Sequence, residues 1–201
     1  MSVRRAVAAA LLLALVAGAC SSGSKEPQGK PGVSEQHLVK GDLTLDTVAW
    51  DEVSPRKAFG PLDDANRASV MKTLQATFDA TVVGPLTKGR AGTIDTLFTA
   101  DAATRANGQD RSALFDEGLP RVDDLEATKA NVRLTALDNG SGPGLVVAKI
   151  DWDVRGDGVH VRRIGELSLV PVLGTWLVGA YTVITTRTAG GSTTTTTAVS
   201  G

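Results

Sequence analysis

The hydrophobic pattern of the chain changes period near residue 126. Between residues 65 and 83, apolar residues recur at every fourth position, the spacing of an amphipathic helix. The members of this stripe are Val70, Leu74, Phe78 and Val82, with Met71 beside them. After residue 126, apolar and polar residues alternate, which is typical of strands with one buried face. The pattern therefore predicts helices first and a sheet second.

The predicted helices have recognisable ends. Asp63 and Asp64 suit the N-cap of the long helix, and Gly84-Pro85 is expected to stop it. Three short helices are expected to follow. They are predicted over residues 93–98, over residues 100–106 with Thr99 as the cap, and through Glu117 with Asp110 as the cap.

Four strands are expected after the helices, over about residues 126–137, 145–155, 158–170 and 175–187. The inward face of the first two is predicted to comprise Ala130, Val132, Leu134, Ala136, Val146, Ala148, Ile150, Trp152 and Val154. Gly156-Asp157 predicts a two-residue hairpin turn. That turn sets a register with these pairs: Val154–Val159, Trp152–Val161, Val146–Leu167, Asp153–His160 and Asp151–Arg162.

The same register places Arg163 beside Ile150 on the inner face, with Gly165 opposite Ala148. A buried arginine needs a partner, so Arg163 should meet an acid from the helices, reach water in an open cavity, or bind an anionic group. A bulge at Gly165 that turns Arg163 outward is the alternative. We expect Arg163, Trp152 and Ile150 to line a ligand pocket, with Arg163 orienting an acidic head group at its mouth.

The outer face of the predicted sheet is not uniformly polar. It is expected to carry Val147, Ile164, Leu177, Tyr181 and Val183, with Tyr181 opposite Glu166. An apolar patch of this kind usually marks an interface. Either the segment that contains Leu43, Leu45 and Trp50 covers the patch, or a second copy does, and we favour a homodimer.

The N-terminal sequence predicts export and a lipid anchor. Arg4 and Arg5 precede an apolar run, residues 6–17, that is too short to span a bilayer and suits a signal peptide. Ala17-Gly18-Ala19-Cys20 resembles the lipobox of bacterial lipoproteins, with Ala17 where that family prefers leucine. The resemblance implies that Cys20 carries diacylglycerol and holds the mature chain on the extracytoplasmic face of the cell membrane. Cys20 is the only cysteine, and the alternative is an ordinary signal peptide with an idle thiol.

The chain then divides into four parts: a signal peptide (1–19), a lipidated cysteine with a flexible tether (20–40), one α+β domain (41–188) and a disordered, Thr-rich tail (189–201). The order of elements over residues 63–188, together with Gly174-Thr175-Trp176, resembles the nuclear-transport-factor-two-like superfamily, which includes ketosteroid isomerases. The resemblance implies N-terminal helices packed on a curved, four-stranded antiparallel meander sheet, cone-shaped around a cavity.

Composition excludes several chemistries. Without residues 1–19 the chain has 19 basic and 22 acidic residues, which gives no electrostatic case for nucleic acid. Two histidines and one cysteine provide neither a metal site nor a nucleophile–His–acid set, and no cofactor is indicated. Asp95 and Asp101 are the acids that could face inward.

Three functions remain open. The first is a non-catalytic binding module that holds a small apolar or amphipathic ligand, and the second is an envelope scaffold or adaptor that acts through its outer sheet face. The third is an isomerase-like enzyme.

Overall fold

The computed structural model describes residues 46–53, 63–138 and 143–200 of the 201-residue chain. They belong to the second of two compact units, residues 36–201. The predicted signal peptide, Cys20, the tether, Leu43 and Leu45 lie outside the described residues, so the interpretations placed on them stay predictions. Within the described ranges, no helix combines the length and the apolar character that a membrane crossing requires.

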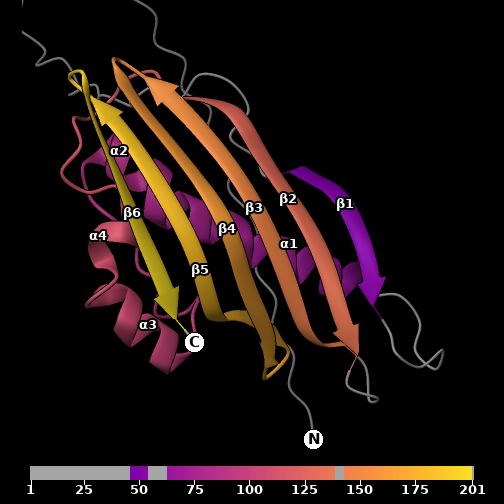
Figure 1. Cartoon of the computed structure of the whole chain (residues 1–201). Coiled ribbons are helices and arrows are strands. Elements are labelled where there is room, and N and C mark those ends of the chain that lie inside the picture. The colour runs from indigo at the N-terminus through magenta and orange to yellow at the C-terminus, as the bar shows by residue number, and fades with distance from the viewer. Residues whose placement is uncertain (1–45, 54–62, 139–142, 201) are drawn as a thin grey trace, which may run out of the picture. The chain divides into compact units, whose positions relative to one another are not determined.

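The domain is α+β, with helices followed by a five-stranded antiparallel meander rather than the predicted four strands. The five strands are β2 (Glu126–Asp138), β3 (Pro143–Gly156), β4 (Val159–Val172), β5 (Thr175–Ala189) and β6 (Ser192–Ser200). A sixth strand, β1 (Asp46–Val53), pairs in parallel with β2 at the opposite edge from β6. Trp50 therefore lies in an edge strand that extends the sheet. The helices pack against one face of the sheet (Figure 1).

The long helix begins as predicted and ends later than predicted. Asp63 caps α1 (Asp64–Phe78), since its Oδ1 accepts a hydrogen bond of 2.7 Å from the backbone N–H of Asn66. A π-helical turn (Asp79–Val83) follows, and α2 (Gly84–Lys88) continues the helix through Gly84-Pro85. The prediction that Gly84-Pro85 stops the helix is wrong because proline is tolerated in the first turn of a helix. The segment ends instead at Gly89, whose φ of 68° suits glycine.

Of the three short helices, α3 (Ala100–Asn107) is confirmed, although the side chain of Thr99, at its N-cap position, makes no capping hydrogen bond, and the other two are corrected. Residues 95–97 form a turn in place of the helix predicted over 93–98, and the backbone groups of Leu97 and Thr99 exchange hydrogen bonds of 2.9 Å with Val178 of β5. The last helix, α4 (Arg111–Leu114), is shorter than predicted, and the Asp110 side chain does not cap it. That carboxylate accepts a hydrogen bond from the Tyr181 hydroxyl instead.

The β3–β4 hairpin turns one residue later than predicted, at Asp157-Gly158. Both residues have positive φ, 44° and 75°, the conformation that an Asp-Gly hairpin turn adopts. Gly156 stays in β3, where a Cβ would collide with the Asp124 carbonyl oxygen.

The predicted hairpin pairs are therefore wrong by two positions. The observed pairs are Val154–Val161, Asp153–Arg162, Trp152–Arg163, Ile150–Gly165, Ala148–Leu167 and Val146–Leu169. A slip of two residues keeps every side chain on its predicted face, because the side-chain period of a strand is two.

A bulge in β5 overturns part of the predicted outer face. Ser168 pairs with Ala180 but Leu169 pairs with Val178, which leaves Gly179 as an extra residue. Beyond the bulge, the residues of β5 that were predicted to point outward point inward, and those predicted to point inward point outward. Tyr181 and Val183, predicted to point outward, are therefore buried in the core at 2% and 1% exposure.

The predicted pairing of Glu166 with Tyr181 is wrong for the same reason. Glu166 lies opposite Thr182 on β5. On the outer face it forms an ion pair of 3.4 Å with Lys149 of β3.

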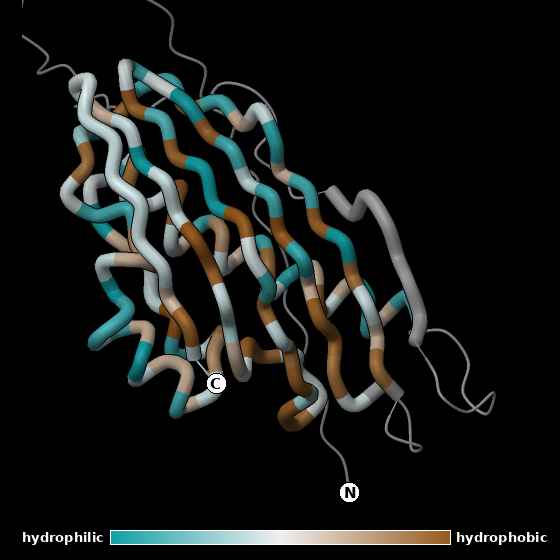
Figure 2. Tube along the Cα trace, in the orientation of Figure 1, coloured by the Kyte–Doolittle hydropathy of each residue, from teal (hydrophilic) through white to brown (hydrophobic). Residues whose placement is uncertain are grey.

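The predicted disordered tail is a strand. β6 pairs with β5 from Tyr181–Ser200 to Ala189–Ser192, and Ala198 and Ser200 are buried. Threonine is β-branched and favours strands, but its intermediate hydropathy gives no alternation to detect. In Figure 2, β6 is pale over most of its length, whereas teal and brown segments succeed one another along β2 to β5.

The core lies between the helices and the inner sheet face. The predicted helix stripe is buried, as is the predicted inward face of β2 and β3. Phe78 contacts Trp152 edge-to-face, with ring centroids 5.0 Å apart. These inward residues, predicted from periodicity, are confirmed.

Candidate functional site

Arg163 points into the core, as predicted, and is 2% exposed. Its guanidinium donates from Nη2 to Asp116 Oδ2 at 3.0 Å, from Nη1 to Thr81 Oγ1 at 2.8 Å and from Nε to Thr185 Oγ1 at 3.0 Å. Of the three partners considered for a buried arginine, the structure supplies the acid, from the segment that follows α4.

A second arginine shares the same carboxylate. Arg187 Nε donates to Asp116 Oδ1 at 2.6 Å, while its Nη1 and Nη2 reach Thr196 Oγ1 and the Ala113 carbonyl. Asp116 is fully buried. Burial lowers the pKa of Arg163, Asp116 opposes that shift, and Arg187 adds to it. Arginine stays charged in proteins, so two buried cations depend on one anion.

The π-helical turn that precedes Pro85 positions this network. Proline has no N–H to donate to the Thr81 carbonyl, and the Gly84 N–H donates to Asp79, five residues back. The carbonyls of Ala80 and Thr81 are thereby freed and accept hydrogen bonds from the backbone N–H groups of Gly92 and Asp116, at 2.9 and 3.1 Å. The π-turn thus fixes the backbone of Asp116 directly opposite Arg163.

A row of buried threonines completes the polar side of the helix. Thr77 and Thr81 donate their hydroxyls to the carbonyls four residues earlier, and Thr73 donates to the Trp176 carbonyl. The oxygen of Thr81 is left to accept from Arg163. Sequence reasoning missed this row, although its spacing of four was a usable signal. It also missed Asp116 and Arg187, for which no local signal exists.

The predicted ligand-contacting residues are enclosed by protein. Trp152 and Ile150 are 2% and 4% exposed, and the three nitrogens of the Arg163 guanidinium have protein partners. A role for Arg163 at the mouth of an open pocket has no support in this arrangement. Among the described residues, the indole Nε1 of Trp152 is buried without a hydrogen-bond partner.

Surface hollows lie away from Arg163. One, of about 670 Å³, is bounded by the π-turn and the 90–97 loop and includes Asp79, Lys88 and Arg90. Partial burial raises the pKa of Asp79, against the lowering effects of a hydrogen bond from Gln75 and the charge of Lys88. Another, of about 610 Å³, surrounds the β3–β4 hairpin.

The acids considered for catalysis do not face the core. Asp95 is exposed and accepts a hydrogen bond from Asn107, and Asp101 is exposed on α3, where it lines a surface hollow together with Gly179 of β5 and Ser200 of β6. The described part of the chain contains no group of three or more His, Cys, Asp or Glu side chains that could hold a metal.

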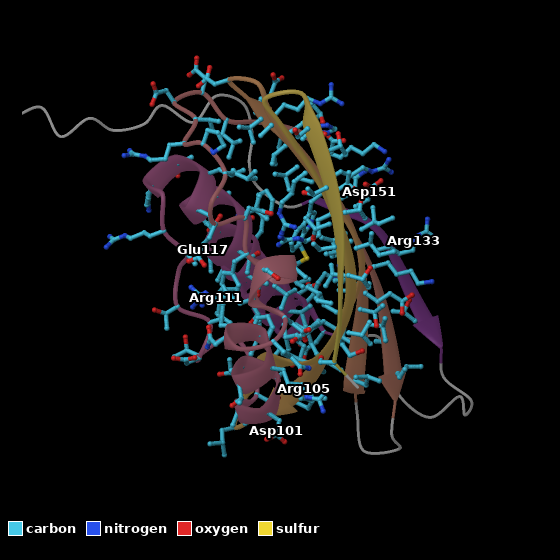
Figure 3. The ribbon with its side chains drawn as sticks, turned by 60° about the vertical axis from the view of Figure 1, so that its left-hand side comes forward. Asp101, Arg105, Arg111, Glu117, Arg133 and Asp151 are labelled. Atoms are coloured by element: carbon cyan, nitrogen blue, oxygen red, sulfur yellow. The ribbon has the colours of Figure 1, made fainter. Side chains whose placement is uncertain are left out.

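The second face of the sheet is not covered by the described helices. Figure 3 shows the sheet nearly edge-on, with the helices on one side and Asp151 and Arg133 on the other. The outer face of β2, β3 and part of β4 carries paired charges. Lys129 and Arg162 approach Asp151 at 3.1 and 3.6 Å.

Asp153 anchors the hairpin end of this charged region. Burial opposes its ionisation, but hydrogen bonds from Thr128 and His160 and the nearby charges of His160 and Arg155 outweigh that effect and lower its pKa. A depressed carboxyl pKa contributes stability above the unfolded pKa that is lost as the pH falls through the folded pKa.

The outer face of β5 and β6 carries no charge, and on β4 Ile164 lies beside it, between the outward Arg162 and Glu166. Ile164, Ile184 and Val199 are 38%, 40% and 53% exposed. Ile164 pairs directly with Ile184, and the neighbouring positions are threonines of β5 and β6. We call Ile164, Ile184, Val199, Thr182 and Thr197 the β-branched patch.

Tyr181 is the only tyrosine in the chain, so its ionisation can be measured to test whether its side chain is buried on the inner face. Burial first, then its hydrogen bond and charge interaction with Asp110, raise its pKa above the ordinary value. We expect no tyrosinate absorbance as the folded protein passes pH of about 10, the pKa of a free tyrosine. Because the unfolded state ionises first, stability should fall above that pH.

An ultraviolet pH titration, with circular dichroism followed in parallel, checks this prediction. Asp110→Asn should lower the pKa of Tyr181, since it removes the negative charge and keeps an acceptor. A tyrosine that titrates near pH 10 in the folded wild-type protein would contradict the buried placement.

Searches of protein-family models, curated proteins and solved structures return no match to this chain.

Proposed function

We propose that the protein is a non-catalytic interaction module of the cell envelope, which binds another envelope protein through the outer face of its sheet. The observation that carries the proposal is the β-branched patch on a sheet face that the described helices leave open. Exposed aliphatic side chains at adjacent strand positions are typical of protein interfaces.

The charged part of the same face supports a protein partner. Lys129, Asp151 and Arg162 form a connected set of ion pairs, and Lys149 pairs with Glu166. Charges of both signs beside an apolar centre resemble the rim and core of a protein–protein interface. They do not favour an anionic lipid surface, which a single-sign basic face would bind.

The lipid anchor belongs to the same proposal. Diacylation of Cys20 would hold the domain at the extracytoplasmic face of the cell membrane, and two acyl chains are enough for stable anchoring. Residues 21–33 are rich in Ser, Gly and Pro, a composition that lets a tethered domain reach partners. Cys20→Ser should move the protein out of the membrane fraction and abolish labelling with a fatty-acid probe.

A photo-crosslinking experiment in cells tests whether the outer face of the sheet contacts a partner protein. A photoreactive residue at Ile184 should give adducts with one or a few envelope proteins, and the same residue at Asp101, on the helix side, should not. Adducts at Asp101 only would contradict the proposal. Adducts with lipid at Ile184 would assign the face to the membrane instead of a protein.

A ligand held inside a cone-shaped fold of the nuclear-transport-factor-two-like kind is the second candidate. The buried, unpartnered Nε1 of Trp152 favours it, because a donor in that position would be satisfied by an acceptor that is not part of the described chain. Native mass spectrometry of protein extracted from membranes checks this candidate. A bound small molecule that is lost in Trp152→Phe would support it.

A further inference from the structure

The outer edge of β6 is the basis of an inference that does not depend on the proposed function. β6 is the last strand in the sheet order, and among the described residues its second side has no strand partner. The part of β5 that extends past β6 is closed by the Leu97–Thr99 segment, which pairs with Val178. The stretch of sheet edge on this side that lacks a strand partner among the described residues is therefore β6 itself, against which α4 packs from the helix side. Figure 3 turns this edge forward.

The composition of β6 leaves this edge without the usual protection. Ser192–Ser200 (STTTTTAVS) contains no charge, no proline and no glycine. Natural proteins protect edge strands with charged residues, proline or bulges, because a bare edge pairs readily with another strand. The opposite edge follows that rule, since three of the eight residues of β1 are acidic.

Self-pairing suits the side chains of β6. Threonines already face each other across β5 and β6, with Oγ1 atoms 3.3 Å apart for Thr186–Thr195 and 3.0 Å apart for Thr188–Thr193. An antiparallel copy of β6 would present the same threonine row to this strand, and Thr–Thr pairs stabilise antiparallel sheets. An uncharged strand meets its own copy without placing like charges opposite each other.

We propose that β6 pairs in antiparallel orientation with β6 of a second copy, about a two-fold axis perpendicular to the sheet. The two sheets of six strands would then form one sheet of twelve, with both outer faces on the same side. To keep the outward threonines of both strands on that side, the axis must pass midway between one residue of β6 and the same residue of the second copy. The sequence predicted a homodimer through an apolar patch on the outer face, and this arrangement moves the self-contact to the edge beside that patch.

The first test compares two kinds of lysine variant by sedimentation of the full chain in detergent. Thr195→Lys combined with Thr197→Lys places charges on the edge strand, and Thr182→Lys places one on the same face of β5, the neighbouring interior strand. The wild type and Thr182→Lys should be dimers. The edge variant should keep its circular dichroism and dissociate, with a dimer dissociation constant raised about tenfold or more.

Three results of this test would overturn the proposal. One is a wild-type monomer at high protein concentration, and another is a folded edge variant that stays dimeric. The third is dissociation by Thr182→Lys, which would place the contact on the open face and not at the edge.

Single cysteines give a second test that does not depend on the folding of a charged variant. In a chain with Cys20→Ser, Thr193→Cys, Thr195→Cys and Thr197→Cys are oxidised one at a time, with Thr186→Cys on β5 as the control. The yield of disulfide-linked dimers should be highest at one β6 position and should decrease with distance from it along the strand. No dimer at any β6 position, or equal amounts in the control, would contradict edge pairing.

Discussion

Asp116→Ala should destabilise the protein by about 3–5 kcal/mol, the usual effect of removing one partner from a buried ion pair. The carboxylate of Asp116 is fully buried, and it accepts hydrogen bonds from Arg163 and Arg187. Its removal leaves two guanidinium groups in the core without a counter-charge, and a buried charge without a partner is among the most unfavourable groups in a protein. The free energy of unfolding in urea, measured at neutral pH, checks the prediction.

Two further variants provide comparisons for Asp116→Ala: one removes an arginine of the same network, and the other breaks a surface ion pair. Arg163→Met leaves Asp116 paired with Arg187, so its effect should be clearly smaller than that of Asp116→Ala. Glu166→Ala, which breaks an exposed pair with Lys149, is the surface control and should change stability by about 0–1 kcal/mol. An Asp116→Ala variant as stable as this control would show that the three charged groups do not interact as described.

Ala198→Asp should also lower stability strongly, by about 3 kcal/mol or more, because it places a charge at a fully buried position of β6. Thr197→Asp makes a similar change at the next residue, whose side chain is exposed on the outer face. It should change stability by no more than about 0.5 kcal/mol. The measurement is urea unfolding at low protein concentration, where self-association does not contribute.

This pair of variants separates a strand from a disordered tail. In a disordered segment both substitutions would be neutral, because neither side chain would be buried. A large effect at residue 198 and a small one at residue 197 require the inward–outward alternation of a paired strand.

Periodicity predicted the parts of the fold in which one face is buried over many residues. The stripe from Val70 to Val82 and the inward faces of β2 and β3 are examples. The hairpin register was wrong by two residues, yet Arg163 stayed inward, because an even slip preserves the faces. The prediction that Arg163 points inward therefore required only that the register error be an even number of residues, and not that the turn be placed correctly.

Single-residue irregularities limited the rest of the fold prediction. The extra residue at Gly179 reverses the parity of β5, so Tyr181 enters the core, and nothing nearby distinguishes this glycine from the one at Gly165. Pro85 was interpreted as a helix stop, although a π-turn carries the helix past it. β6 was missed because threonine has no hydropathy contrast from which to infer a face.

The candidate site depends on contacts between distant segments. Asp116 lies in a connection with no pattern of its own, and its backbone N–H is held by the Thr81 carbonyl, 35 residues earlier in the chain. Sequence reasoning could require a partner for Arg163, since a buried cation needs one. It could not identify which of the 22 acidic residues supplies it.

Lysine labelling in intact membranes tests the central claim, that the open sheet face contacts a partner, most directly. Lys129 and Lys149 lie on that face, whereas Lys72 and Lys88 are exposed on the helix side. The modification rate of each lysine by a small amine reagent is compared between intact membranes and purified protein. The account predicts that Lys129 and Lys149 are modified several-fold more slowly in membranes, with Lys72 and Lys88 unchanged. Equal rates at all four lysines, or protection confined to Lys72 and Lys88, would contradict it.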